Sequence, residues 1–278
     1  MIKNKRIVLI CFLLMSVNVF SAKVDTLKVF SPSMDKQIST VVITPEKYSK
    51  DKKYPVIYLL HGFSGNDKDW ITKVPAIKNY SDAYGFIIVC PDGNFASWYF
   101  DSPLIQDSQY ETFVTNELIG YIDLNYKTIA NKEGRAITGL SMGGHGAFYL
   151  AFKHQELYNI AGSMSGALDI KPIADGFAIP QLLGDYARNP EVYKKHSVVD
   201  LVYLLNPKSL NIIFSCGVDD FLYKENMKLH ESLLYNSIPH VFISEPGSHT
   251  WEFWAHSIEV QMNYFSSIFN KTYKISKN

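Results

Sequence analysis

Short, uninterrupted apolar runs alternate with longer amphipathic stretches through most of this sequence. Six runs of five or six residues occur, at 55–60, 86–90, 135–139, 160–164, 211–215 and 240–244. Such runs are typical of strands that are buried on both faces of a parallel sheet. Apolar residues at helical spacing between them predict helices at 106–125, 142–154, 222–235 and 251–270. The alternation therefore predicts an α/β fold with helices on both faces of the sheet.

The part of the chain before the first apolar run has the pattern of a β-hairpin. Segments 26–30 and 38–44 are rich in Val, Ile and Thr, and a Ser-Pro-Ser turn signal separates them. These two segments and the six apolar runs together predict an eight-stranded, mostly parallel sheet. Segment 165–208 is longer than a simple crossover and contains several Gly and Pro residues. We expect it to add short helices over the strand ends.

The first 22 residues have the organisation of a secretory signal peptide. Three cations precede a short apolar run that reaches Phe20, and the small residues Ser21 and Ala22 follow. The run is shorter than the roughly 20 residues that span a bilayer, although an uncleaved anchor is the alternative. We expect cleavage near Ala22, a mature catalytic domain at 23–278, no stable membrane insertion afterwards, and a secreted or periplasmic location.

Charge and cysteine usage exclude several function classes. The chain has 27 cations and 27 anions. Loss of the three N-terminal cations leaves 24 against 27, so the mature net charge is about −3, with no long basic run to bind nucleic acid. Cys90 and Cys216 each end an apolar run, and two buried free thiols are favoured over a disulfide. No Cys/His cluster has zinc-like spacing, and we expect neither metal nor cofactor.

A G-x-S-x-G motif stands between a predicted strand and a predicted helix. Gly139-Leu-Ser141-Met-Gly143 follows run 135–139 and precedes helix 142–154. A sharp strand-to-helix turn lifts the serine hydroxyl out of the sheet and sets it at a helix N-terminus, and small neighbours let the backbone pass. Ser141 is therefore the candidate nucleophile.

A serine hydroxyl needs a base and an acid that orients the base. Two Asp residues, Asp219 and Asp220, follow run 211–215, and His249 follows run 240–244. In parallel sheets such positions meet at the carboxyl edge. His249 is the candidate base, whereas spacing alone leaves the acid open between Asp219 and Asp220, since either could instead cap the next helix.

A developing oxyanion needs two positioned donors. The first candidate is the backbone N–H of Met142, directly after the nucleophile. The second is the N–H of Phe63, in the Gly-rich loop 60–65 that follows the first apolar run.

These motifs together resemble the putative-esterase family of α/β-hydrolases, which includes S-formylglutathione hydrolases, feruloyl and acetylxylan esterases, and mycolyltransferases. The resemblance covers about residues 54–265 and rests on Leu59-Leu-His-Gly-Phe63, Pro91-Asp-Gly93, Ser97-Trp-Tyr-Phe-Asp-Ser102, Gly139-Leu-Ser-Met-Gly-Gly144 and Gly247-Ser-His249. It implies an α/β-hydrolase fold, Ser141 as nucleophile, His249 as base, and Phe63 and Met142 as oxyanion donors. A Gly-x-x-Asp stretch, Gly217-Val-Asp-Asp220, implies Asp220 as the acid.

The resemblance also suggests a substrate. It places Trp98, Tyr99 and Asp101 beside the cleft, and Trp251 could line the same cleft. An exported member of the family is expected to be a serine carboxylesterase that removes acyl groups, acetyl or feruloyl, from carbohydrate. Acyl transfer to a sugar alcohol, an S-formylglutathione hydrolase-like thioesterase and a carbohydrate-binding pseudoenzyme are the alternatives.

Overall fold

The structure, a computed structural model, describes residues 22–275. The predicted signal peptide, residues 1–22, lies outside this range apart from Ala22. The strands are β1 (Lys23–Ser31), β2 (Lys36–Thr44), β3 (Val56–Leu60), β4 (Ile87–Pro91), β5 (Arg135–Gly139), β6 (Ile160–Met164), β7 (Asn211–Gly217) and β8 (His240–Glu245). The helices are α1 (Asp69–Lys73), α2 (Ile77–Tyr84), α3 (Tyr110–Thr112), α4 (Ile119–Asn125), α5 (Met142–Lys153), α6 (Ile179–Leu183), α7 (Pro190–His196), α8 (Tyr223–Tyr235) and α9 (Trp251–Ile275).

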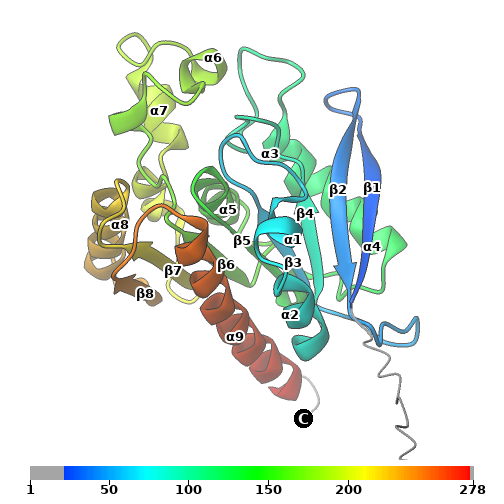
Figure 1. Ribbon diagram of the computed structural model, residues 1–278. Helices are drawn as coiled ribbons and strands as arrows, with labels where there is room; N and C mark the ends of the chain where they lie inside the picture. The colour runs from blue at the N-terminus through cyan, green and yellow to red at the C-terminus, as the bar shows by residue number, and fades with distance from the viewer. Residues whose placement is uncertain (1–21, 276–278) are drawn as a thin grey trace, which may run out of the picture.

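The eight strands form one sheet in the order β1-β2-β4-β3-β5-β6-β7-β8 (Figure 1). β1 and β2 are an antiparallel hairpin, and β2 is also antiparallel to β4. The remaining neighbours, from β4 to β8, are parallel. This is the mostly parallel sheet with an N-terminal hairpin that the sequence predicts. Because the central strands run the same way, the segments that follow them gather at one edge.

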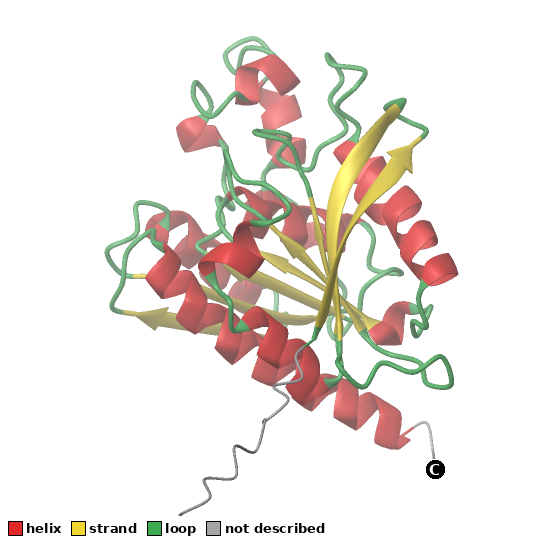
Figure 2. Ribbon diagram, turned by 45° about the vertical axis from the view of Figure 1, so that its right-hand side comes forward, coloured by secondary structure: helices red, strands yellow, loops and turns green. Residues whose placement is uncertain are grey.

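Helices cover both faces of the sheet, as Figure 2 shows. One face packs against α4, α5 and α8, with Ile122, Phe148 and Leu229 among the buried residues. The other face packs against α1, α2 and α9, with Trp70 and Phe265 in its core. Strands β3 to β6 have no exposed residue, because both of their faces are covered.

One predicted helix differs from the structure at its start. The prediction begins at residue 106, whereas helical backbone begins at Tyr110 and passes through a π-helical stretch, Phe113–Leu118, before α4. The carboxylate of Asp101 accepts hydrogen bonds from the Thr112 N–H at 2.9 Å and the Thr112 hydroxyl at 2.6 Å. A distant side chain therefore caps this helix, and local sequence could not reveal it.

Segment 165–208 forms short helices beyond the carboxyl edge of the sheet, as expected. It contains α6, α7 and the 3₁₀ turns Lys171–Ile173, Val198–Asp200 and Val202–Leu204, and α6 and α7 lie at the top of Figure 1. Cys90 and Cys216 are both buried free thiols. Within residues 22–275, no helix combines the length and apolar character needed to cross a bilayer.

Candidate active site

The backbone is strained at Ser141, where strand β5 turns into helix α5. Ser141 is the N-cap residue of α5, with φ of 53° and ψ of −118°. An L-residue in such a sparsely populated backbone conformation costs about 1–3 kcal/mol, so surrounding contacts must hold it. The Ser141 N–H donates to the Met164 carbonyl at 2.9 Å, and its own carbonyl accepts from the His145 N–H at 2.9 Å. The turn leaves the half-buried Ser141 hydroxyl facing the cavity described below.

Close packing explains why the last position of the motif, Gly143, is a glycine. A Cβ at this position would lie 2.4 Å from the His61 carbonyl oxygen and 2.6 Å from that of Leu60. Helix α5 therefore starts directly against the end of β3, and only glycine leaves room for this approach. The same contact brings the loop after β3 beside the nucleophile.

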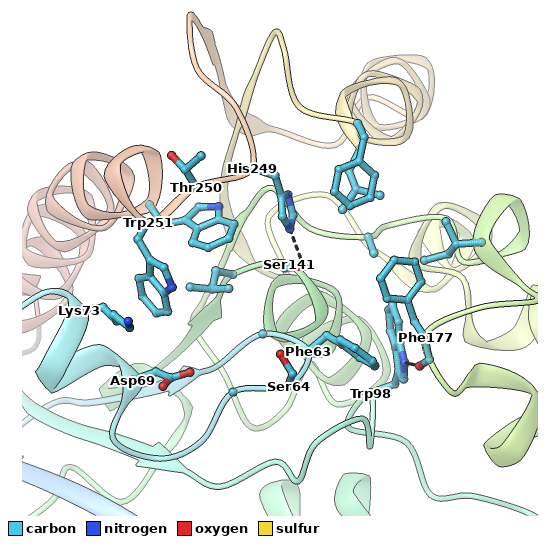
Figure 3. A pocket seen from close by; sticks show the side chains of 18 of the residues that line it. Phe63, Ser64, Asp69, Lys73, Trp98, Ser141, Phe177, His249, Thr250 and Trp251 are labelled. Atoms are coloured by element: carbon cyan, nitrogen blue, oxygen red, sulfur yellow. Dashed lines mark hydrogen bonds between the residues drawn. The ribbon is translucent and has the colours of Figure 1, made fainter.

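Ser141, His249 and Asp220 form a continuous chain of hydrogen bonds. The His249 Nε2 lies 2.9 Å from the Ser141 Oγ (Figure 3). The His249 Nδ1 lies 2.8 Å from Oδ2 and 3.1 Å from Oδ1 of Asp220. An ionised carboxylate only accepts, so Nδ1–H is the donor and Nε2 is free to accept the serine proton. This is the geometry in which an imidazole can act as a general base.

Asp220, and not Asp219, contacts the imidazole. The Asp220 side chain is fully buried, and it also accepts the Leu222 N–H at 2.9 Å. Burial raises the pKa of this carboxyl, but the hydrogen bond and charge of His249 outweigh it and hold the pKa below its ordinary value. Asp219 is exposed. The ambiguity that spacing left is resolved geometrically, because the turn after β7 points only the second aspartate inward.

The two loops that carry Asp220 and His249 touch each other. A Cβ on Gly217 would lie 2.1 Å from the Gly247 carbonyl oxygen, so the close approach requires glycine there. The His249 ring then lies between two aromatic side chains. Its centroid is 4.7 Å from Phe221 and 4.8 Å from Trp254, which meets it edge-on at 89°. These contacts limit the orientations open to the imidazole.

The loop after β3 carries the candidate oxyanion donor, Phe63. Among the described residues, neither the Phe63 N–H nor the Met142 N–H donates to a protein acceptor. A Cβ on Gly62 would lie 3.4 Å from the Cβ of Ser141, which places the loop against the nucleophile. Two unpaired backbone donors close to Ser141 are what a developing oxyanion needs.

His61 anchors this loop, a role that the sequence did not reveal. The buried ring accepts the Gly93 N–H at Nε2, at 2.7 Å, so Nδ1 is the donor to the Gly62 carbonyl, also at 2.7 Å. The Gly62 carbonyl and the Phe63 N–H belong to one planar peptide unit. By holding the carbonyl, His61 sets the direction of the N–H.

Ser141 and His249 open into a cavity of about 770 Å³. Figure 3 shows two groups of side chains on opposite sides of the pair. We call the side with Phe63, Trp98 and Phe177 the aromatic arm. We call the side with Asp69, Lys73, Thr250 and Trp251 the polar arm. Trp98 and Trp251 thus line the cavity, as the sequence suggested.

Tyr99 and Asp101, which the sequence placed at the cleft, lie behind its wall. Tyr99 is fully buried, and its hydroxyl donates to the His61 carbonyl at 3.1 Å. Asp101 is engaged in capping the helix at Thr112. Neither side chain lines the cavity, so we do not assign them substrate contact. Their stretch borders the site, but the backbone turns these two side chains inward.

Sequence reasoning missed Phe177 and Phe221, which line the cavity. Phe221 directly follows Asp220, and this position was a usable signal. Phe177 lies in segment 165–208 without a motif, and only the folded chain brings it to the cleft.

A known protein family matches the sequence over most of its length. The model of the family described as Putative esterase matches residues 31–265. The chain belongs to this family of esterases. Its fold and family make it a serine hydrolase of the carboxylesterase type, with an ester as substrate.

The esterase is similar to several known proteins. It is 29% identical over 265 residues to an acetyl esterase of Caldicellulosiruptor saccharolyticus. This match covers 86% of this chain and 96% of the acetyl esterase. It is 28% identical over 270 residues to the diacylglycerol acyltransferase/mycolyltransferase Ag85A of Mycobacterium tuberculosis, covering 83% of this chain and 77% of that one. A solved ferulic acid esterase matches with a TM-score of 0.78 and 28% identity, over 90% of this chain and 99% of that chain.

Proposed function

We propose that this esterase is exported and hydrolyses acyl esters of carbohydrate through a covalent acyl-enzyme on Ser141. The observation that carries the proposal is the hydrogen-bonded chain from Asp220 through His249 to Ser141, in which His249 and Ser141 line a cavity. The signal-peptide pattern of residues 1–22 supports export.

In the first half-reaction, the Ser141 Oγ attacks the ester carbonyl carbon while the His249 Nε2 takes its proton. The carbonyl oxygen becomes an oxyanion, and the N–H groups of Phe63 and Met142 stabilise it. Asp220 stabilises the imidazolium that forms. The tetrahedral intermediate then collapses, the bond to the alcohol oxygen breaks, and His249 gives its proton to the leaving alcohol.

In the second half-reaction, water replaces the alcohol. His249 takes a proton from the water as the water oxygen attacks the acyl carbon on Ser141. A second tetrahedral intermediate forms with the same two donors. Its collapse breaks the bond to the serine oxygen, which recovers its proton from His249, and the carboxylic acid leaves.

The two arms of the cavity support an acyl ester of a polar alcohol. The aromatic arm offers ring faces and edges to a flat or small acyl group. The polar arm offers the charged Asp69 and Lys73 beside Trp251, which suits a hydroxylated alcohol such as a sugar. The likeness to an acetyl esterase and a ferulic acid esterase supports acetyl or feruloyl as the acyl group.

Acyl transfer is the second candidate, because the chain is also similar to a mycolyltransferase over most of its length. Transfer would need only that a sugar hydroxyl, in place of water, attacks the acyl-enzyme. The same cavity would serve both reactions, since the polar arm would bind the acceptor alcohol.

A substrate panel tests the proposal. We expect the purified protein to release acid from acetylated xylan, or from feruloylated xylan, faster than from the methyl esters of the same acids. Adding glucose as an acceptor should leave free acid as the main product. Preferential formation of a new sugar ester would establish the transferase instead, and inertness toward every ester would refute both.

A further inference from the structure

Two stretches of left-handed backbone carry two members of the aromatic arm, Trp98 and Phe177. Trp98 and Tyr99 have φ values of 56° and 59°, and Phe177 and Ala178 have φ values of 52° and 58°. Bulky L-residues adopt this conformation rarely, and it persists only where neighbouring contacts hold it. The two stretches come from distant parts of the chain, so tertiary contacts must account for both.

One side-chain hydrogen bond joins them. The Trp98 Nε1–H donates to the Phe177 carbonyl at 2.9 Å, across 79 positions of sequence. The Trp98 side chain is itself well fixed. It is 2% exposed, stacks on Phe100 at 6.4 Å and meets His145 edge-on at 5.5 Å. Trp98 therefore provides a rigid donor for a loop that has no regular secondary structure of its own.

The Phe177 side chain, unlike that of Trp98, is exposed. Its side chain is 41% exposed, and it lines the cavity on the side of the aromatic arm (Figure 3). Its ring meets Phe63 edge-to-face at 5.3 Å and 87°. Trp98 thus holds the backbone of Phe177 while the ring remains free to contact a ligand beside Ser141.

We propose that Phe177 determines which acyl groups the enzyme accepts, and that Trp98 is the positioning residue that holds it there. This inference rests on the proposed esterase function. The polar arm contains the charged Asp69 and Lys73, which suit a hydroxylated alcohol. The acyl group would therefore occupy the aromatic arm. A flat aryl acyl chain gains edge-to-face contacts with Phe63 and Phe177, whereas an acetyl group has no ring to offer.

The test measures acyl selectivity at a constant leaving group. The probes are 4-nitrophenyl 3-phenylpropanoate and 4-nitrophenyl acetate. Selectivity is the kcat/KM for the phenylpropanoate divided by the kcat/KM for the acetate. Phe177→Ala should lower this ratio about 3- to 10-fold, as expected for one lost aromatic contact. The loss should come mainly from a higher KM for the aryl ester, since no reacting atom is disturbed.

Trp98→Phe tests positioning, because it keeps a buried ring and removes the N–H. We expect it to lower the same ratio, again mainly through KM. In the Phe177→Ala background it should lower the ratio no further, since no ring remains to be placed. Equal losses in both backgrounds would overturn the positioning role of Trp98.

Phe95→Ala is the matched control. The Phe95 ring also packs against Phe63, with ring centroids 4.9 Å apart, but Phe95 is 59% exposed and does not line the cavity. The Phe95→Ala variant should keep the wild-type ratio. A fall in the ratio equal to that of Phe177→Ala would overturn the proposal. An unchanged ratio in Phe177→Ala would also overturn the proposal. So would a Phe177→Ala effect seen only between ethyl acetate and 2-phenylethyl acetate, because these two esters differ in the alcohol alone. A wild-type protein inert toward all four esters would refute the esterase function itself.

Discussion

At the scale of single residues, neighbours in sequence meet very different surroundings. Asp219 is exposed, whereas the Asp220 carboxylate is fully buried against the His249 ring. The motif Gly217-Val-Asp-Asp220 already favoured the second aspartate, but only by resemblance. The physical reason is the turn at Gly217, which requires close contact with Gly247 and directs Asp220 toward the imidazole.

We predict that Asp220→Asn lowers kcat by about 10³- to 10⁴-fold on 4-nitrophenyl acetate. The amide cannot stabilise the imidazolium, and it favours the wrong tautomer of His249. Asp219→Asn is the matched control, with an expected change of less than about 2-fold, because exposed polar side chains without partners contribute little. A larger loss at Asp219 would reverse the assignment.

At the scale of elements, the positions of helices depend on contacts that sequence does not display. The sequence predicted strands β3 to β8 to within about two residues, because apolar runs record burial directly. It missed α1 and α2, which are only 5 and 8 residues long, shorter than the stretch over which helical periodicity is recognised.

Glu111, in the first turn of the helix that Asp101 caps, joins this helix to α5. Its carboxylate accepts from Tyr149, Lys153 and His154 at 2.7–2.9 Å.

This cluster predicts a pH-dependent stability. Burial raises the pKa of Glu111, but the hydrogen bonds of His154 and Lys153 outweigh it and lower the pKa from 4.5 to about 2. Because the folded-state pKa is depressed, Glu111 stabilises the fold above its unfolded pKa, and this stability is lost as pH falls toward the folded value. Glu111→Gln should therefore cost about 3 kcal/mol at pH 6 but only about 1 kcal/mol at pH 3.

Urea unfolding at both pH values measures this difference. Glu46→Gln is the control, since Glu46 is exposed and belongs to no ion pair among the described residues, and it should show no such dependence on pH. A Glu111→Gln cost that stays constant between pH 6 and pH 3 would contradict the account.

At the scale of the whole molecule, the parallel sheet explains why distant segments share one site. Ser141, Asp220 and His249 follow β5, β7 and β8, whose carboxyl ends lie at the same edge. The loop with Phe63 follows β3, the neighbour of β5, so these four positions were accessible from the sequence. Phe177 and the His61 anchor were not, because both depend on loops whose path only tertiary contacts determine.

The central claim is that Ser141 carries the acyl group between the two half-reactions. Mass spectrometry of the protein, quenched in acid during turnover of 4-nitrophenyl acetate, tests it most directly. We predict one added acetyl group, on the peptide that contains Ser141. Ser141→Ala should lack this adduct and lose at least about 10⁴-fold in kcat. An acetyl group on another residue, or wild-type turnover by Ser141→Ala, would contradict the account.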